Sequence, residues 1–139
     1  MVMHELLVRI DGKRFSARLL KDKAPTTCQA ILRRLPIDGK AIHARWSGEA
    51  IWMSMEKHPI KLGFENQTGY PSRGEPLFYP GFISEKELLI PYGTCSFASR
   101  SGALAGNHFA TISENLDELA TVGRAVLWEG AKGISISGT

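Results

Sequence analysis

The segment HARWSGEAIWM, residues 43–53, gathers the side chains of this chain that are best suited to hold a small molecule. His43 carries an imidazole that exchanges protons near neutral pH, Arg45 a guanidinium that binds carboxylates, and Trp52 an indole on which a flat ligand can stack. These three groups together would hold a small organic anion with a flat or apolar body. Glu49, at the tip of the segment, is a candidate proton donor or acceptor.

Two later loops supply further candidates. Asn107 and His108 follow the glycine-rich stretch SRSGALAG, whose glycines would allow the backbone to approach a ligand closely. If this loop closes over the segment, His108 is a second imidazole near Arg45 that orients the ligand or moves a proton; otherwise it begins a strand and bonds a nearby carbonyl. Tyr92 and Arg100 would complete a polar rim, and ordinary surface positions suit both equally well.

The segment is expected to be a β-hairpin whose pairing decides which side chains face the same way. Gly48 suits the first central position of a type II′ turn with Glu49 second, which places Arg45 opposite Trp52. Because side chains alternate along a strand and opposed residues share a face, one face is the expected core: Ile42, Ala44, Trp46, Ile51, Met53 and Met55. The other face would carry His43, Arg45, Ser47, Ala50, Trp52 and Ser54. Its alternative use is to cover the outside of the sheet.

The rest of the chain predicts a mostly-β domain that positions this hairpin. A first helix begins near Pro25 and is stopped by Pro36, and a second has Ser113 as N-cap and ends at Gly130. Strands are expected at residues 5–10, 15–20, 42–46, 50–55, 77–79, 87–90, 96–98, 108–112 and 134–136. Their short, turn-punctuated spacing is typical of a sandwich or barrel. We expect a single domain over residues 1–139, a small closed or partly closed barrel of about eight strands with two flanking helices.

Residues 56–74 contain several glycines and prolines and are predicted to form a long irregular loop. Loops of this length inside a compact domain are commonly functional, so we expect a rim or lid over the ligand. Cys28 falls on a predicted helix face and Cys95 in a predicted strand, without metal-binding or redox spacing. Both are expected to be small buried hydrophobic residues.

Composition argues against several classes of function. The net charge is only +3 and its lysines and arginines are scattered, which argues against nucleic-acid binding. The chain has no long apolar run, so we expect no membrane span and a cytoplasmic location. Phosphate-cradling and dinucleotide patterns are missing, and His43, Glu49 and His108 lack ligand-like spacing, so we expect no cofactor and no metal.

Several segments resemble a bacterial family of unassigned function whose members adopt a cyclophilin-like β-barrel. The matching pieces are APTTCQAILRRLP, GKAIHARWSGEAIW, YPSRGEPLFYPG, ELLIPYG, LAGNHFATI and GRAVLWEG, which run from residue 24 to residue 130. The resemblance implies a cyclophilin-like fold for the whole domain. A shared fold does not carry an activity with it, so the function must be argued from the site.

Three functions follow as hypotheses. The first is binding of a small, carboxylate-bearing organic ligand, and the second is peptidyl-prolyl isomerisation. Cyclophilins carry an arginine and a glutamine at positions that fall on Ala44 and Trp52 here, while Arg45 lies one residue late, which argues against the isomerase. The third is a non-catalytic assembly module that uses the aromatic patch. We favour ligand binding, in a protein that we expect to be a homo-oligomer.

Overall fold

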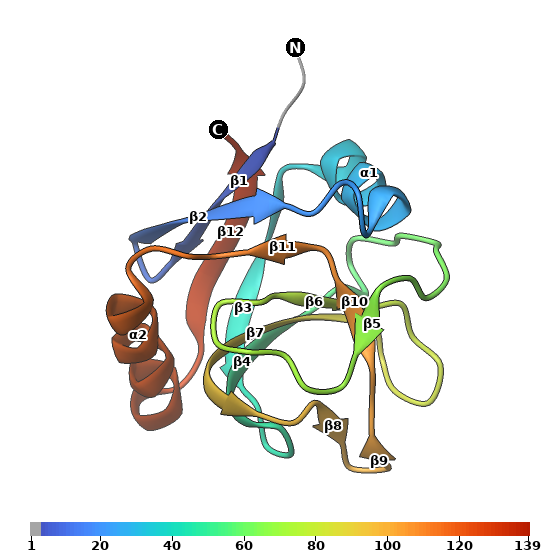
Figure 1. The fold of residues 1–139 in the computed structure, drawn as a ribbon. Helices are drawn as coiled ribbons and strands as arrows, with labels where there is room; N and C mark the ends of the chain where they lie inside the picture. The colour runs from blue at the N-terminus through green and yellow to red at the C-terminus, as the bar shows by residue number, and fades with distance from the viewer. Residues whose placement is uncertain (1–3) are drawn as a thin grey trace.

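The protein, a computed structural model that describes residues 4–139, combines two helices with many short strands (Figure 1). The helices are α1 (Pro25–Arg34) and α2 (Leu116–Glu129). The strands are β1 (Glu5–Ile10), β2 (Lys13–Leu19), β3 (Ile37–His43), β4 (Gly48–Ser54), β5 (Gln67–Thr68), β6 (Leu77–Tyr79), β7 (Glu87–Cys95), β8 (Ala98–Ser99), β9 (Gly102–Ala103), β10 (Gly106–His108), β11 (Ala110–Thr111) and β12 (Lys132–Gly138). The expected mostly-β class with two helices is confirmed.

Ten of these strands form one antiparallel sheet in the order β11-β2-β1-β12-β3-β4-β7-β6-β10-β5, and β8 pairs only with β9. Strands from opposite ends of the chain meet in this sheet, because β1 lies beside β12 with Leu6 opposite Gly138 (Figure 1). Helix α2 packs against β3, β4 and β7. Within residues 4–139, neither helix has the length and apolar character needed to cross a lipid bilayer.

The sheet is not closed into a barrel, so the closed form of the expected closed or partly closed barrel is not found. Its hydrogen-bonded order ends on β11 at one side and on β5 at the other, and no ladder among residues 4–139 joins the two. Only Phe109 separates β10 from β11, so chain continuity rather than strand pairing brings the two sides of the sheet together. The cyclophilin-like assignment stays a prediction.

The helix boundaries follow the sequence signals with one exception. Helix α1 has Pro25 in its first turn, and it buries Cys28 and Ile31 as expected. Helix α2 ends at Gly130 as expected, but it begins at Leu116, so Ser113 is not its N-cap. The preceding chain is held extended, because the N–H of Ile112 donates to the carbonyl oxygen of Gly74 over 2.6 Å.

Two apolar clusters bury both faces of the β4–β7 pair. The main core lies on one face and includes Ile51, Met53 and Met55, as expected from the alternation of β4. A smaller cluster on the other face consists of Ala50, Leu77, Tyr79, Leu89, Phe97 and Leu104. The hairpin face that was expected to be polar and exposed is therefore largely covered.

Close packing of α2 on the sheet depends on Gly123. A Cβ atom at this position would lie 2.2 Å from Cδ2 of Tyr92, so the ring of Tyr92 occupies the space that any larger residue would need. The Tyr92 hydroxyl in turn lies 2.8 Å from Nε2 of His43. The lack of a side chain at Gly123 thus lets α2 approach the sheet and leaves the Tyr92 ring where its hydroxyl can bond to His43.

We expect Gly123→Ala to lower the free energy of unfolding by about 1–3 kcal/mol, because overpacking forces Tyr92 from its site. Urea denaturation would measure the loss. Gly133→Ala is the matched control, since a Cβ atom there meets nothing within 4 Å. Equal stability of the two variants would contradict the packing argument.

Candidate functional site

The hairpin pairs in a register that differs from the expected one by three residues. His43 lies opposite Ile51 instead of Ser54, and Ile42 lies opposite Trp52. A shift by an odd number of residues moves the side chains of one strand to the opposite face relative to the other strand. The side chains of β3 therefore lie on the faces opposite to those predicted, while those of β4 lie on the predicted faces. The imidazole of His43 therefore lies on the main-core side of the sheet, on the opposite face from the Trp52 indole.

The register differs because Gly48 does not form a tight turn. Its φ of 99° belongs to an irregularity where β4 meets β7, with Gly48 opposite Cys95 and Ala50 opposite Pro91. The hairpin closes instead through a wider loop, in which the N–H of Ala44 donates to the carbonyl oxygen of Ala50 over 2.9 Å. Two expected roles are consequently wrong: Trp46 is 56% exposed rather than part of the core, and Ile42 is 43% exposed.

A cavity of about 400 Å³ lies on the face of the sheet that carries Trp52, beside the smaller apolar cluster. It is called the side cavity here, and its lining residues come from three parts of the chain: Ile42, His43, Ala44, Arg45, Trp46, Ser47, Trp52, Ser84, Glu85, Glu87, Leu89, Ala98, Ser99, Arg100 and Ser101. Arg45, Trp52 and Arg100 therefore share one cavity, as a binding role requires. None of residues 56–74 lines it, so the lid expectation for that loop is wrong at this site.

Trp52 occupies the middle of the cavity wall. It pairs with Ile42 on β3 and with Leu89 on β7, which gives the indole apolar neighbours on both sides. The next row of the same face holds Ser54, Glu87 and Tyr79, paired across β4, β7 and β6. Ile42 rather than Arg45 lies opposite Trp52, so the expected pairing of Arg45 with Trp52 is wrong, and no cation–π contact joins the two in residues 4–139.

Glu87 places a carboxyl group at one end of this wall. The residue is only 8% exposed, and no protein group in residues 4–139 donates a hydrogen bond to its carboxyl group. Burial, together with the negative charge of Glu85, raises the pKa of Glu87 from 4.5 to about 8. At neutral pH this group is a protonated acid that faces the cavity, so it can donate a hydrogen bond or release a proton.

Two arginines mark the other end of the side cavity. Arg45 and Arg100 are both exposed, and the loops that carry them are joined through Ser47. Its hydroxyl donates to the Ala98 carbonyl over 3.1 Å and accepts from the Ala98 N–H over 3.0 Å. Neither arginine is among the charges that shift the pKa of Glu87.

Three of the other predicted residues, His43, Glu49 and Tyr92, meet between the sheet and α2, and of these only His43 also lines the side cavity. Nδ1 of His43 lies 2.8 Å from the Ala44 carbonyl oxygen and must be the protonated nitrogen, so in the neutral ring Nε2 accepts a hydrogen bond from the Tyr92 hydroxyl. The Glu49 carboxylate accepts from the N–H of Thr94 over 2.9 Å. Burial first, and then the charge of Glu49, raises the pKa of Tyr92. These residues stabilise the hairpin on the side of the sheet that faces α2.

Asn107 is fully buried and serves as a structural anchor. Its amide nitrogen donates to Thr27 Oγ1 and to the Gly63 carbonyl, each over 3.0 Å, and its oxygen accepts from the Glu65 N–H over 3.0 Å. The side-chain nitrogen and oxygen of Asn107 are therefore both used by hydrogen bonds within the protein. No part of Asn107 lines the side cavity.

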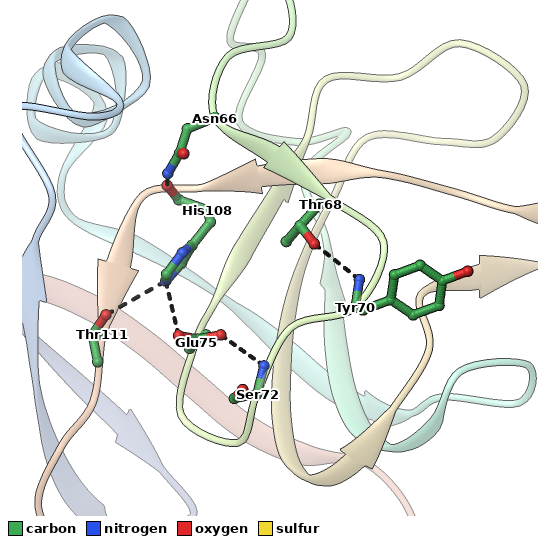
Figure 2. Close-up of polar contacts among 7 residues, drawn as sticks. All are labelled: Asn66, Thr68, Tyr70, Ser72, Glu75, His108 and Thr111. Atoms are coloured by element: carbon green, nitrogen blue, oxygen red, sulfur yellow. Dashed lines mark hydrogen bonds and ion pairs between the residues drawn. The ribbon is translucent and has the colours of Figure 1, made fainter.

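His108 lies with a separate group of polar residues (Figure 2). Its Nε2 is 3.4 Å from Thr111 Oγ1 and 3.9 Å from Glu75 Oε2, while its carbonyl oxygen accepts from the Asn66 amide. Glu75 also accepts from the Ser72 N–H over 2.7 Å, as Figure 2 shows. The glycine-rich loop thus does not bring His108 to Arg45, and the two predicted imidazoles belong to different surroundings.

Glu85 and Glu87 were missed by the sequence reasoning. A signal existed for Glu87, since it lies two residues before Leu89 on a predicted strand and therefore shares its face. The burial of that face was not visible, because Leu77, Phe97 and Leu104 cover it from distant segments.

The fold and the cavity define a small mostly-β protein with a ligand-sized hollow on the flank of an open antiparallel sheet. The chain belongs to the DUF3830 family, described as proteins of unknown function, which its sequence matches over residues 6–138. The expected membership of a family of unassigned function is confirmed at this level. No curated protein matches the chain.

Two solved structures share the fold. The structure of McbB in complex with tryptophan is similar with a TM-score of 0.75 and 16% identity, covering 95% of this chain and 44% of McbB. The solution structure of the hypothetical protein AF2241 from Archaeoglobus fulgidus is similar with a TM-score of 0.67 and 18% identity, covering 99% of this chain and 96% of that protein. This chain therefore spans less than half of McbB. At these identities the likeness establishes the fold alone.

The raised pKa of Glu87 makes stability depend on pH. Between about pH 4.5 and pH 8 the folded protein retains a proton that the unfolded chain has released, so the stability linked to this group is complete below pH 4.5 and falls as pH rises to 8. The fall is at most about 1.4 kcal/mol per pH unit. We expect urea denaturation at pH 5 and pH 8 to show a smaller fall for Glu87→Gln than for wild type. Parallel pH profiles would contradict the assignment.

Proposed function

We propose that this protein binds a small organic molecule, with a carboxylate and a flat apolar body, in the side cavity. One observation carries the proposal: two guanidinium groups and an indole, those of Arg45, Arg100 and Trp52, line the same hollow. Ligand sites commonly combine apolar walls with a few polar groups that fix orientation, and a hollow of about 400 Å³ has a suitable size.

The two ends of the cavity would divide the recognition. Arg45 and Arg100 carry exposed charges that can pair with a carboxylate, and arginine does so through two parallel hydrogen bonds. Trp52, held between Ile42 and Leu89, offers its indole to a flat ring. The ligand would be small, because the cavity is bounded by the loops that contain Ser84 and Ser99.

The structural neighbour supports a small-molecule ligand. McbB has a similar fold, and its structure holds tryptophan, a molecule with a carboxylate and a flat apolar ring. Because the identity is 16% and the chain spans less than half of McbB, tryptophan serves here as a guide to probe chemistry. An indole carboxylate is accordingly the first probe.

We expect indole-3-propionate to bind wild-type protein and raise its thermal unfolding temperature in a dose-dependent way. Arg45→Ala and Arg100→Ala should each weaken binding at least about tenfold, because each removes a charged partner of the carboxylate. Isothermal titration calorimetry would give the affinities. Arg14→Ala on the exposed side of β2 is the matched control and should bind as wild type. Saturable binding that both cavity variants retain would overturn the proposal.

Self-association is a second candidate function, favoured by a separate apolar groove of about 510 Å³. Trp46 and Tyr70 border this groove, and Tyr70 is 78% exposed, while Phe97 and Leu104 line it. Aromatic side chains exposed around an apolar surface are typical of protein interfaces. A second copy of the chain would bury them.

We expect wild-type protein at tens of micromolar to have twice the mass of a single chain by light scattering, and Tyr70→Ser to be a monomer. Trp128→Ser, which removes an exposed indole from α2, is the control and should remain a dimer. A monomeric wild type across this concentration range would rule out self-association through the groove.

A further inference from the structure

The side cavity contains the carboxyl group of Glu87, which takes part in no hydrogen bond within residues 4–139. Glu87 is more than nine-tenths buried, faces the cavity and receives no hydrogen bond from residues 4–139. Its carboxyl oxygens remain open to the cavity, because they are not among the solvent-inaccessible polar atoms that lack a partner in residues 4–139, so a ligand group in the cavity can supply the hydrogen bond that the protein does not. We propose that Glu87 is the centre of a binding subsite for a protonated organic amine, with Glu85 and Trp52 beside it. The subsite shares the cavity and Trp52 with the proposed function but uses Glu87 and Glu85 in place of the two arginines.

The charges around Glu87 favour a cation. Glu85, on the chain just before β7, is the charged neighbour that acts on Glu87, and it accepts a hydrogen bond from Ser54 Oγ over 2.8 Å. Tyr79 lies opposite Glu87 on β6, and its hydroxyl already accepts from the N–H of Ile83. The two arginines lie at the far end of the cavity and exert no resolved effect on Glu87. A positive group placed here therefore meets two carboxyl groups.

An organic ammonium fits this end better than a metal ion. Among residues 4–139 there is no group of three or more His, Cys, Asp or Glu side chains that could hold a metal. Trp52, one row along the same sheet face from Glu87, supplies an indole, and indoles attract ammonium groups through the face of the ring. A carboxylate beside an aromatic wall is suited to an alkylammonium attached to an apolar body.

Binding of the amine must release a proton. An alkylamine has a pKa near that of lysine, about 10, and enters as R–NH₃⁺ at pH 7. Glu87, with a pKa of about 8, is about nine-tenths protonated at that pH. An ion pair requires Glu87 to ionise, so its carboxyl O–H bond breaks and the proton passes to the buffer. No other bond changes.

The test is calorimetric titration of wild-type protein with tryptamine at pH 7 in phosphate and in Tris. These buffers take up protons with different enthalpies, so the difference between the two titrations counts the protons released. We expect about 0.9 proton per tryptamine bound, from the protonated fraction of Glu87. At pH 9, in buffers that act there, the wild type should still bind tryptamine with almost no net proton release, because Glu87 is then largely ionised and the roughly one tenth of the amine that is neutral takes up a proton on binding.

Two variants locate the effect. Glu87→Gln keeps the shape of the protonated acid, and we expect it to bind tryptamine at least about tenfold more weakly and to release no proton. Glu114→Gln, on an exposed residue remote from the cavity, is the matched control and should behave as wild type.

The outcomes separate this inference from the proposed function. If indole-3-propionate binds through the arginines but tryptamine shows no saturable binding, the amine subsite is overturned and the carboxylate proposal stands. If tryptamine binds with proton release while indole-3-propionate does not bind, the reverse holds. Tryptamine binding with the same enthalpy in both buffers, or undiminished binding to Glu87→Gln, also overturns the subsite.

Discussion

The pairing of β4 with β7 has apolar clusters on both faces, and the position of every polar group around the side cavity depends on this. Alternation sends Ile51 and Met53 into the main core and Ala50 into the smaller cluster. A slip by one residue would exchange these sets, so the register of the pair is strongly specified. Trp52 and Glu87 lie on the second face for the same reason. The way in which β4 and β7 bury their apolar residues thus determines which polar side chains face the cavity.

Glu87 stands where packing alone would favour an apolar residue. Its neighbours across the sheet and along the strand include Tyr79 and Leu89, and a leucine at position 87 would extend the smaller cluster without the cost of burying an acid. Positions at which a chain accepts such a cost are candidates for function, because a perturbed carboxyl facing a cavity is useful in binding and proton transfer. The basic end differs, since Arg45 and Arg100 remain exposed and cost the fold little.

Local sequence patterns predicted the elements well and their mutual arrangement less well. Strands β1 and β2 lie close to where they were expected, and so do helix α1 and the inward face of β4. These features depend on neighbouring residues. The register of the β3–β4 hairpin failed because Gly48 serves the contact with β7, a strand nearly forty residues further along the chain. A positive φ can suit a turn or a bulge, and only the distant partner decides between them.

In the candidate site, too, local sequence predicted which residue types were suitable but not which of them the fold brings together. Residue types identified Arg45, Trp52 and Arg100, and the fold brings these three to one cavity. Asn107 and His108 have equally suitable side chains, but long-range hydrogen bonds use the first for structure and place the second beside Glu75. No property of a single sequence distinguishes a polar side chain that holds the fold from one that faces a ligand. That distinction lies in contacts between residues that are far apart in the chain.

Strand β12 runs from Lys132 to Gly138, yet it lies between β1 and β3 in the interior of the sheet. Without it, the β1–β2 hairpin has no ladder connecting it to β3, and the sheet remains in two pieces. A ribosome releases the segments in order, so the nascent chain cannot unite these pieces until β12 has emerged. Loss of residues 132–138 would therefore leave the facing edges of β1 and β3 unpaired and open to aggregation.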